Sequence, residues 1–319
     1  MSLRDKPTGV KAPDMSVNQQ QEIIDGLTRE NASISPKYFY DTRGSELFEA
    51  ITRVPEYYPT RTELAVMQTH SRAIAQSVGP GTTLIEFGAG NCAKARALCR
   101  LIDPVRFVGI DISADYLQDA IKSMRSEFPG IELRAVAADL SHGFELPADI
   151  PRAKRLVFYP GSSIGNFDPE HARELLERMR SLIDGDGALL IGIDLPKDVA
   201  ALEAAYDDAA GVTAAFNLNV LAHVNLLIGS NFISGQWLHR SFFNASESRI
   251  EMHLEAVTDV LVCWPGGERS FAAGERIHTE NSYKYPLDKF ITLLSLAGFA
   301  KTQTWTDEHH WFAVIRACA

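Results

Sequence analysis

Cysteine and basic residues are both scarce in this sequence. Its 319 residues include four cysteines and no C-x-x-C pair, which excludes a disulfide-rich secreted scaffold. Lysine and arginine together number 31 against 41 aspartates and glutamates, giving a formal net charge of −10 at pH 7. Such an excess of acid argues against nucleic acid or an anionic membrane surface as the main partner. We therefore predict neither nucleic-acid nor membrane binding.

Long apolar runs are also missing. No segment approaches the roughly 20 apolar residues that cross a bilayer, and residues 1–6 lack the apolar region of a secretory signal. With 45% hydrophobic and 23% charged residues, the composition is that of a folded globular protein, long enough for about two domains. We expect a cytoplasmic protein with reduced cysteines that acts on a small molecule as a monomer.

Strand and helix patterns alternate through the middle of the chain. Strands are predicted at 82–87, 106–110, 131–136, 155–159 and 188–193, and helices at 93–102, at 114–128 and after Asn166. This alternation predicts a parallel sheet with right-handed crossovers. A helix at 287–297 and a hairpin of strands at 302–306 and 311–317 close the chain. We therefore predict an α/β fold with a seven-stranded, mostly parallel sheet.

Other segments do not continue this alternation. Residues 249–256 alternate apolar and polar, as a half-exposed antiparallel strand does. Aromatic residues and turn formers crowd 35–62, which predicts an irregular, partly buried segment, while 63–78 and 202–224 look helical. We predict a flexible tail at 1–15, a domain built on the parallel sheet from 61–196 and 286–319, and a second, α+β domain from 16–60 and 197–285.

A glycine-rich turn follows the first predicted strand of the sheet. Gly88 and Gly90 let the backbone approach a ligand closely. Asp111 lies at the end of the next strand, where a carboxylate can bind ribose hydroxyls, and Asp139 at the end of the third is placed to meet an adenine edge. Ligands of such sheets bind outside these carboxyl ends. The pattern therefore predicts a nucleotide-type site.

Two nucleotide ligands fit this turn. Ala93 completes a G-x-G-x-x-G/A pattern, so NAD stays open. Glu86, however, places an acid two residues before the first glycine, which suits the amino group and sulfonium of S-adenosylmethionine (SAM) better than a pyrophosphate. The closing helix and hairpin also suit the seven-stranded methyltransferase sheet. The residues favour SAM over NAD. We therefore predict the Rossmann-like class I fold of SAM-dependent methyltransferases, in which the sheet domain binds SAM and the second domain binds the substrate.

Five segments, in order along the chain, share their patterns with one known family. They read YFYD at 38–41, PEYYPTRTE at 55–63, GSSIGN at 161–166, AYDDAAGVTAAFN at 205–217 and RIEM at 249–252. These strings resemble the histidine-specific Nα-methyltransferases of ergothioneine biosynthesis. The resemblance runs from about Pro36 to near the C-terminus, and the long string around Tyr206 is highly specific.

The resemblance implies an enzyme that converts L-histidine to its Nα-trimethyl betaine, hercynine, with three molecules of SAM. The family's cofactor positions fall on Gly88, Lys94, Asp111, Asp139 and Leu140. Its amino-acid-binding positions fall on Tyr57, Asn166 and Tyr206. Its imidazole-reading segment falls on Glu280, Asn281 and Ser282, followed by Lys284. Small departures are the loop Gly-Ala-Gly-Asn for Gly-Ser-Gly-Thr, Ser163 for threonine and Leu140 for phenylalanine; none removes a polar group that the chemistry needs.

These residue types suit methyl transfer to an amine. Asn166 can hold the carboxylate or the amine through its amide, and Tyr206 can add a hydroxyl donor. Tyr40 and Tyr57 offer aromatic faces to a growing quaternary ammonium. We assign catalytic roles to Tyr40 and Asn166.

The residues around 280 suit recognition of an imidazole. Glu280 and Ser282 are two apart, so in an extended segment they point to the same side and can address the two ring nitrogens. Met252, on the apolar side of its strand, can form part of the pocket wall. Two rivals stay open: N-methylation of another amino acid, such as tryptophan or a prenylated derivative, and a non-catalytic SAM-binding sensor.

We predict no metal. His309 and His310 are adjacent at an expected turn and have no third ligand at a recognised spacing. Cys92 and Cys99, on the helix after the glycine turn, are expected to be packing residues.

Overall fold

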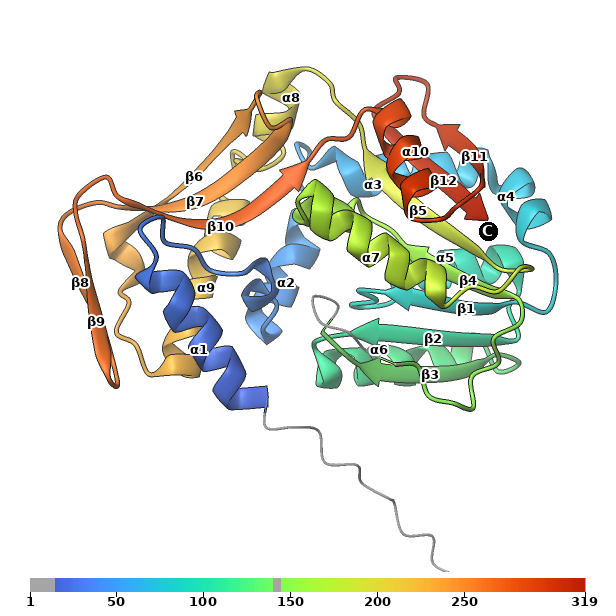
Figure 1. The fold of residues 1–319 in the computed structure, drawn as a ribbon, viewed down its shortest axis with the longest axis horizontal. Coiled ribbons are helices and arrows are strands. Elements are labelled where there is room, and N and C mark those ends of the chain that lie inside the picture. Colours follow the sequence, from blue (N-terminus) through green and yellow to red (C-terminus); the bar gives the residue numbers. More distant parts are fainter. Residues whose placement is uncertain (1–14, 140–144, 319) are drawn as a thin grey trace, which may run out of the picture.

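The computed structural model describes residues 15–139 and 145–318. Its largest sheet consists of β1 Thr83–Phe87, β2 Arg106–Asp111, β3 Glu132–Ala137, β4 Arg155–Tyr159, β5 Ala188–Asp194, β11 Lys301–Thr306 and β12 Phe312–Cys318. The strand order of these seven is β11-β12-β5-β4-β1-β2-β3 (Figure 1). Neighbours from β5 to β3 pair in parallel, whereas β12 is antiparallel to both β5 and β11. The predicted α/β fold with a seven-stranded, mostly parallel sheet is confirmed.

Helices cover both faces of this sheet, which separates two hydrophobic clusters. They are α3 Tyr58–Thr69, α4 Ser71–Val78, α5 Ala93–Ile102, α6 Ala114–Glu127, α7 Pro169–Ser181 and α10 Leu287–Leu296. Apolar side chains of α7 and α10 pack with one face, and those of α3 to α6 with the other. The start of α7 follows its sequence, because the Asp168 carboxylate accepts hydrogen bonds from the backbone N–H groups of Glu170 at 3.1 Å and His171 at 3.0 Å.

A second region lies beside the carboxyl ends of the parallel strands. It contains the sheet β10-β7-β6 and the hairpin β8-β9, whose strands are β6 Trp237–Asn244, β7 Arg249–Ala256, β8 Val260–Trp264, β9 Gly267–Phe271 and β10 Arg276–Tyr283 (Figure 1). Its helices are α1 Met15–Thr28, α2 Thr42–Ile51, α8 Val199–Ala204 and α9 Val212–Ile228. Residues 23–58 and 202–277 supply its own hydrophobic cluster. This separate cluster supports the two-domain division, whose boundaries stay a prediction.

Three expectations about local structure, for 35–62, 63–78 and 202–224, were wrong in detail. The segment 35–62 is not irregular, because Asp41 caps α2 by accepting from the Gly44 N–H at 2.6 Å, and α3 begins at Tyr58. The helix expected at 63–78 is divided at His70 into α3 and α4.

The helix expected at 202–224 is likewise two helices, α8 and α9. The Asp208 carboxylate begins α9 by accepting from the N–H groups of Val212 at 2.9 Å and Thr213 at 2.7 Å. Gly211, just before α9, takes a φ of 70° that ends any continuous helix. An apolar stripe alone does not reveal such a break.

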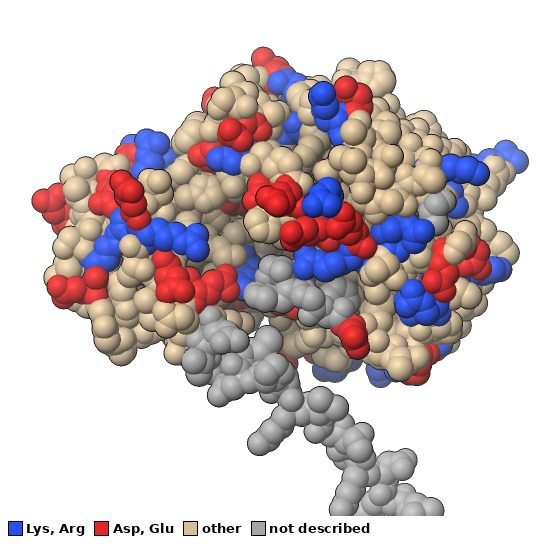
Figure 2. Space-filling model, viewed as in Figure 1, with Lys and Arg blue, Asp and Glu red and all other residues tan. Residues whose placement is uncertain are grey.

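Helix hydropathy and surface charge bear on the predictions about membrane and nucleic-acid partners. No helix within 15–139 and 145–318 is long and apolar enough to cross a membrane. Lysine and arginine side chains lie among acidic ones on the face drawn in Figure 2. Residues 1–14 of the predicted tail lie outside the described residues, while Met15 already belongs to α1.

Candidate functional site

The glycine turn connects β1 to α5. Gly88 and Gly90 have φ angles of 68° and 50°, in the left-handed region that favours glycine. The Gly88 N–H donates to the Ile110 carbonyl at 2.8 Å, which ties the turn to the end of β2. A Cβ added at either glycine meets no atom of residues 15–139 or 145–318 within 4 Å. The space over this turn is therefore open to a ligand.

Asp111, the last residue of β2, is fixed against this turn. One carboxylate oxygen accepts from the Gly90 N–H and the other from the Ser113 N–H, both at 2.9 Å. Burial raises the pKa of Asp111, and these two N–H bonds act in the opposite direction. The structure thus brings the predicted Gly88, Gly90 and Asp111 together at one edge of the sheet.

Glu86 lies on β1 directly below the turn and is 1% exposed. Among the described residues, its Oε2 atom is buried without a hydrogen-bond partner. Burial raises the pKa of Glu86 well above its usual range, although the charge of Lys94 lowers it. A buried carboxyl oxygen without a partner, beside an open glycine turn, fits a ligand that brings a positive charge or an N–H donor.

Lys94 is held by a residue that sequence reasoning missed. The Glu63 carboxylate, 1% exposed on α3, contacts Lys94 Nζ at 2.6 Å and accepts from the Gly161 N–H at 2.9 Å. Glu63 fits because Gly192 opposite it has no side chain; a Cβ there would lie 2.1 Å from Glu63 Oε1. Glu63 stands in the PEYYPTRTE string, but only the fold brings it to the glycine turn.

Asp139 follows β3 and is engaged by the N-terminal region. Its Oδ2 atom lies 3.0 Å from Lys37 Nζ, and Lys37 also contacts Glu22 of α1 at 2.6 Å. Burial works against the charge of Lys37, but Glu22 and Asp139 raise its pKa overall. The predicted partner Leu140 lies outside the described residues.

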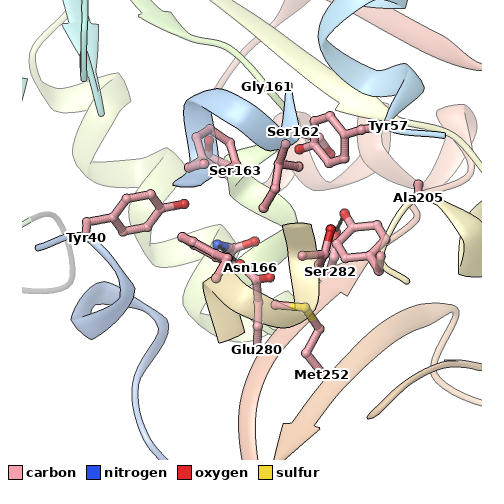
Figure 3. A pocket seen from close by; sticks show the side chains of 15 residues that line it. Tyr40, Tyr57, Gly161, Ser162, Ser163, Asn166, Ala205, Met252, Glu280 and Ser282 are labelled. Carbon is pink, nitrogen blue, oxygen red and sulfur yellow. Dashed lines mark hydrogen bonds between the residues drawn. The ribbon is translucent and has the colours of Figure 1, made fainter. Parts of the chain in front are cut away.

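A pocket opens between the two regions, and Figure 3 shows it at close range. Its lining residues are Tyr40, Phe48, Ile51, Tyr57, Gly161, Ser162, Ser163, Asn166, Ala205, Tyr206, Thr213, Phe216, Met252, Glu280 and Ser282. They include every predicted catalytic and substrate-binding residue except Asn281. Asn281 lies on the opposite side of β10, where its Oδ1 contacts His278 Nε2 at 2.9 Å. Phe48 and Phe216 were missed because apolar helix positions read as core, and no local pattern marks Thr213.

Asn166 and Glu280 meet inside this pocket from distant segments. Asn166 ends the 3-10 helix η2 Ser163–Asn166, and its Nδ2 donates to Glu280 Oε1 of β10 at 3.0 Å (Figure 3). Burial raises the pKa of Glu280 to about 7, against the opposing effects of the Lys284 charge and the Asn166 hydrogen bond. Glu280 therefore changes its charge near neutral pH.

Ser282 belongs to a buried polar network. Its Oγ lies 2.6 Å from the Tyr206 hydroxyl, and Lys284 Nζ donates to Ser282 Oγ at 2.8 Å and to Tyr206 at 3.0 Å. Lys284 Nζ also contacts Asp194 Oδ2 at 2.9 Å. Asp194 at the end of β5 was not foreseen, because nothing in the local sequence links it to Lys284.

Aromatic rings form the rest of the wall. Tyr40 packs edge-on against Phe48 at 5.8 Å between ring centroids, and Tyr57 against Tyr206 at 6.3 Å. Figure 3 shows the hydroxyls of Tyr40 and Tyr57 directed toward the pocket. Burial raises the pKa of both phenols well above the usual value, so they remain protonated donors at neutral pH.

Metal ligands do not gather in the described part of the chain: no group of three or more His, Cys, Asp or Glu there could hold an ion. His309 and His310 lie exposed in the turn between β11 and β12. Cys92 and Cys99 are buried in the cluster that contains α5, and burial raises the pKa of both thiols.

Comparisons with known proteins agree with this geometry. A family model described as "Histidine-specific methyltransferase, SAM-dependent" matches residues 19–319. The histidine N-alpha-methyltransferase of Mycolicibacterium smegmatis is 41% identical over 295 residues, which cover 90% of this chain and 91% of that protein. The protein of the same name from Mycobacterium tuberculosis is 37% identical over 303 residues, covering 91% of each. Ergothioneine biosynthesis protein 1 of Neurospora crassa is 29% identical over 277 residues, covering 84% of this chain and 31% of that protein.

Proposed function

Because the chain belongs to the family of histidine-specific, SAM-dependent methyltransferases, we propose that it methylates the α-amino nitrogen of L-histidine three times. The product is hercynine, a precursor in ergothioneine biosynthesis. The observation that carries the proposal is the pocket in which Glu280 and Ser282 share one face of β10 beside Asn166. Family membership also decides the cofactor in favour of SAM over NAD.

The residues at the carboxyl ends of the strands would hold SAM, which supplies an electrophilic methyl group on its sulfonium. Gly88 and Gly90 leave room for close approach, and Asp111 offers carboxylate oxygens to ribose hydroxyls. Glu86 offers a buried acid to a positive ligand. Lys94 and Asp139 complete the proposed cofactor set, together with Leu140. Asp139 must share its carboxylate with Lys37.

The amino-acid substrate needs a neutral amine in line with the methyl group. The α-amino group of a free amino acid is mostly protonated at pH 7, and desolvation in a buried pocket lowers its pKa and so favours the neutral amine. The pocket supplies that desolvation together with oriented hydroxyl and amide groups from Tyr57, Asn166 and Tyr206. Holding the amine about 3 Å from the methyl carbon contributes more than any strong acid or base.

The pocket also accommodates the growing positive charge. Tyr40 and Tyr57 present aromatic rings beside Asn166, and rings of this kind attract methylated ammonium groups. Neither phenol loses its proton near neutral pH, so neither acts as a phenolate base there. The reaction stops at three methyl groups because the quaternary nitrogen has no lone pair left.

The side-chain end of the pocket favours an imidazole. Glu280 and Ser282 offer polar groups two residues apart, and Met252 closes an apolar wall beside them. An indole would leave one of these buried groups unpaired, a penalty of about 1–3 kcal/mol. The polar pair therefore argues against the tryptophan-type alternative.

The test is mass spectrometry of the purified protein incubated with SAM and each common L-amino acid in turn. We expect histidine to gain one, two and then three methyl groups while the other amino acids stay unmodified. Methylation of a different amino acid would keep the cofactor assignment and overturn the assignment of Glu280 and Ser282. Tight SAM binding without transfer to any amino acid would instead support the sensor.

The remaining expectations concern assembly and location, and we propose a cytoplasmic monomer that binds neither nucleic acid nor membranes. The net charge of −10 supports the last two points. Light scattering after size exclusion checks the mass, for which a monomer gives 35.2 kDa. A dimer mass would contradict the proposal.

A further inference from the structure

We propose that Lys284, paired with Asp194, is a positioning residue that makes Ser282 a hydrogen-bond donor toward the pocket. Ser282 and Glu280 would then select a neutral imidazole with one defined N–H. This inference rests on the proposed histidine activity, and it adds how the pocket distinguishes the protonation state of the ring.

Each of the three N–H groups of the Lys284 ammonium has an acceptor. An ammonium group has three N–H donors and no acceptor. Lys284 Nζ has three acceptors around it, namely Asp194 Oδ2 at 2.9 Å, Ser282 Oγ at 2.8 Å and the Tyr206 hydroxyl at 3.0 Å. The lysine side chain is fully buried. Both hydroxyls must therefore accept from it.

The two hydroxyls are also bonded to each other, with their oxygens 2.6 Å apart. One of them donates to the other. A phenol is a stronger acid than an aliphatic alcohol, so Tyr206 is the better donor and Ser282 the better acceptor. Ser282 Oγ then accepts twice, from Lys284 and from Tyr206, and keeps only its own proton to offer. Tyr206, whose one proton goes to Ser282, is then not the hydroxyl donor to the substrate that its sequence position predicts.

Glu280, in contrast to Ser282, offers a hydrogen-bond acceptor to the pocket. An ionised carboxylate only accepts, and Oε1 already accepts from Asn166 Nδ2 at 3.0 Å. Glu280 and Ser282 both line the pocket (Figure 3). The pocket thus presents one acceptor and one donor, which match the N–H and the bare nitrogen of a neutral imidazole. An imidazolium, with two N–H groups, would set one of them against the Ser282 proton.

The Asp194–Lys284 ion pair is fixed in place by several further contacts. Asp194 also accepts from the Tyr58 hydroxyl at 2.7 Å and contacts Lys197 through Oδ1. Burial opposes the charges of Asp194 and Lys284, but their mutual attraction lowers the pKa of Asp194 and raises that of Lys284. The Asp194 backbone N–H donates to Ser162 Oγ at 2.9 Å, which joins the pair to the turn beside Asn166.

Lys197 offers a matched control. Its side chain is 4% exposed and it shares Asp194 with Lys284. Within the described part of the chain, however, its hydrogen bonds go to Tyr58, Asp194 and Leu195, not to the pocket hydroxyls. Lys197→Met therefore removes a buried charge from the same carboxylate without releasing Ser282.

The experiment compares wild type, K284M, K197M, S282A and the K284M/S282A double variant. For each we would measure kcat and KM for L-histidine, SAM affinity by calorimetry, and thermal unfolding. We expect S282A and K284M each to raise KM about tenfold, the value of one hydrogen bond, with SAM affinity within about threefold of wild type. The double variant should be no worse than K284M alone, because the lysine acts through the serine. K197M should lower stability but keep the histidine KM.

An unchanged KM in K284M, or a multiplicative loss in the double variant, would overturn the proposal.

A measurement on the wild-type protein tests the same proposal if K284M does not fold. With ring-¹⁵N-labelled L-histidine and S-adenosylhomocysteine at pH 8, nitrogen NMR should show one protonated and one bare ring nitrogen in a single tautomer. Two protonated nitrogens, or the tautomer mixture of free histidine, would overturn it. If wild type does not methylate histidine at all, the proposed function has failed rather than this inference.

Discussion

The cofactor edge and the amino-acid pocket lie side by side but are built in different ways. At the cofactor edge, Glu86, Gly88, Gly90 and Asp111 come from two successive parallel strands and their turns, and backbone N–H groups supply the fixed contacts. The pocket instead draws side chains from residues 40 to 282. Local sequence is therefore enough to outline the first site, whereas the second exists only once the two regions have packed together.

Their charges differ as well. The cofactor edge holds a buried carboxyl oxygen, on Glu86, that lacks a partner among the described residues. The pocket, by contrast, rests on Asp194, which is compensated by Lys197 and Lys284. Glu86 at the cofactor edge thus still has room for a positively charged ligand, whereas the charges that hold the pocket in place are already paired within the protein.

The largest effect should come from Asp194→Asn, which leaves two buried lysines without their shared counter-charge. Breaking a buried ion pair from one side costs about 3–5 kcal/mol, so we expect a loss of that size in the free energy of unfolding, measured with urea. Glu86→Gln is the matched change at the cofactor edge. Because it replaces an unpaired buried acid by a neutral amide, it should cost less than about 1 kcal/mol. Equal losses in the two variants would remove the contrast between the sites.

Glu280→Ala should separate the sites by function. It removes a charged acceptor for the imidazole N–H, so kcat/KM for L-histidine should fall about 10- to 100-fold, while SAM affinity by calorimetry should stay within about threefold. Asn281→Ala is the control, since Asn281 is the next residue on β10 and lies on the opposite side from the pocket. A similar loss in Asn281→Ala would show that the effect comes from the strand and not from the pocket.

Asp111→Ala should give the converse result. Its carboxylate holds the glycine turn through Gly90 and is placed to meet ribose hydroxyls. We expect roughly a tenfold weaker SAM affinity. At saturating SAM, the KM for L-histidine should stay near the wild-type value. Unchanged SAM affinity would refute the assignment of Asp111.

A smaller, pH-dependent effect should appear only in the pocket. The raised pKa of Glu280, about 7, means that its carboxyl is protonated and uncharged at lower pH and ionised at higher pH. The ratio of wild-type to Glu280→Gln kcat/KM should therefore rise about tenfold as pH increases from about 6 to about 8. Taking the ratio cancels the titration of free histidine. A ratio that is flat with pH would mean that the charge of Glu280 does not contribute to recognition.

The difference between the sites also explains what could be predicted from the sequence. The seven-stranded sheet and the Gly88–Asp111 juxtaposition follow from short-range patterns and from the rule that parallel strands end at one edge. The pairing of Glu280 with Asn166 was not predictable, because 114 residues separate them and no periodicity links them. The break between α8 and α9 depends on one capping carboxylate, Asp208, within an alanine-rich stretch that reads as continuous helix.

The central claim is that the pocket delivers the α-amine of histidine to the methyl group held at the cofactor edge. Its most direct test is incubation of wild-type protein with L-histidine and SAM that carries a ¹³C-labelled methyl group, followed by NMR of the product. We expect all label to appear in equivalent methyl groups on the α-nitrogen, with the imidazole ring unlabelled. Label on a ring nitrogen, or none in histidine despite SAM binding, would contradict it.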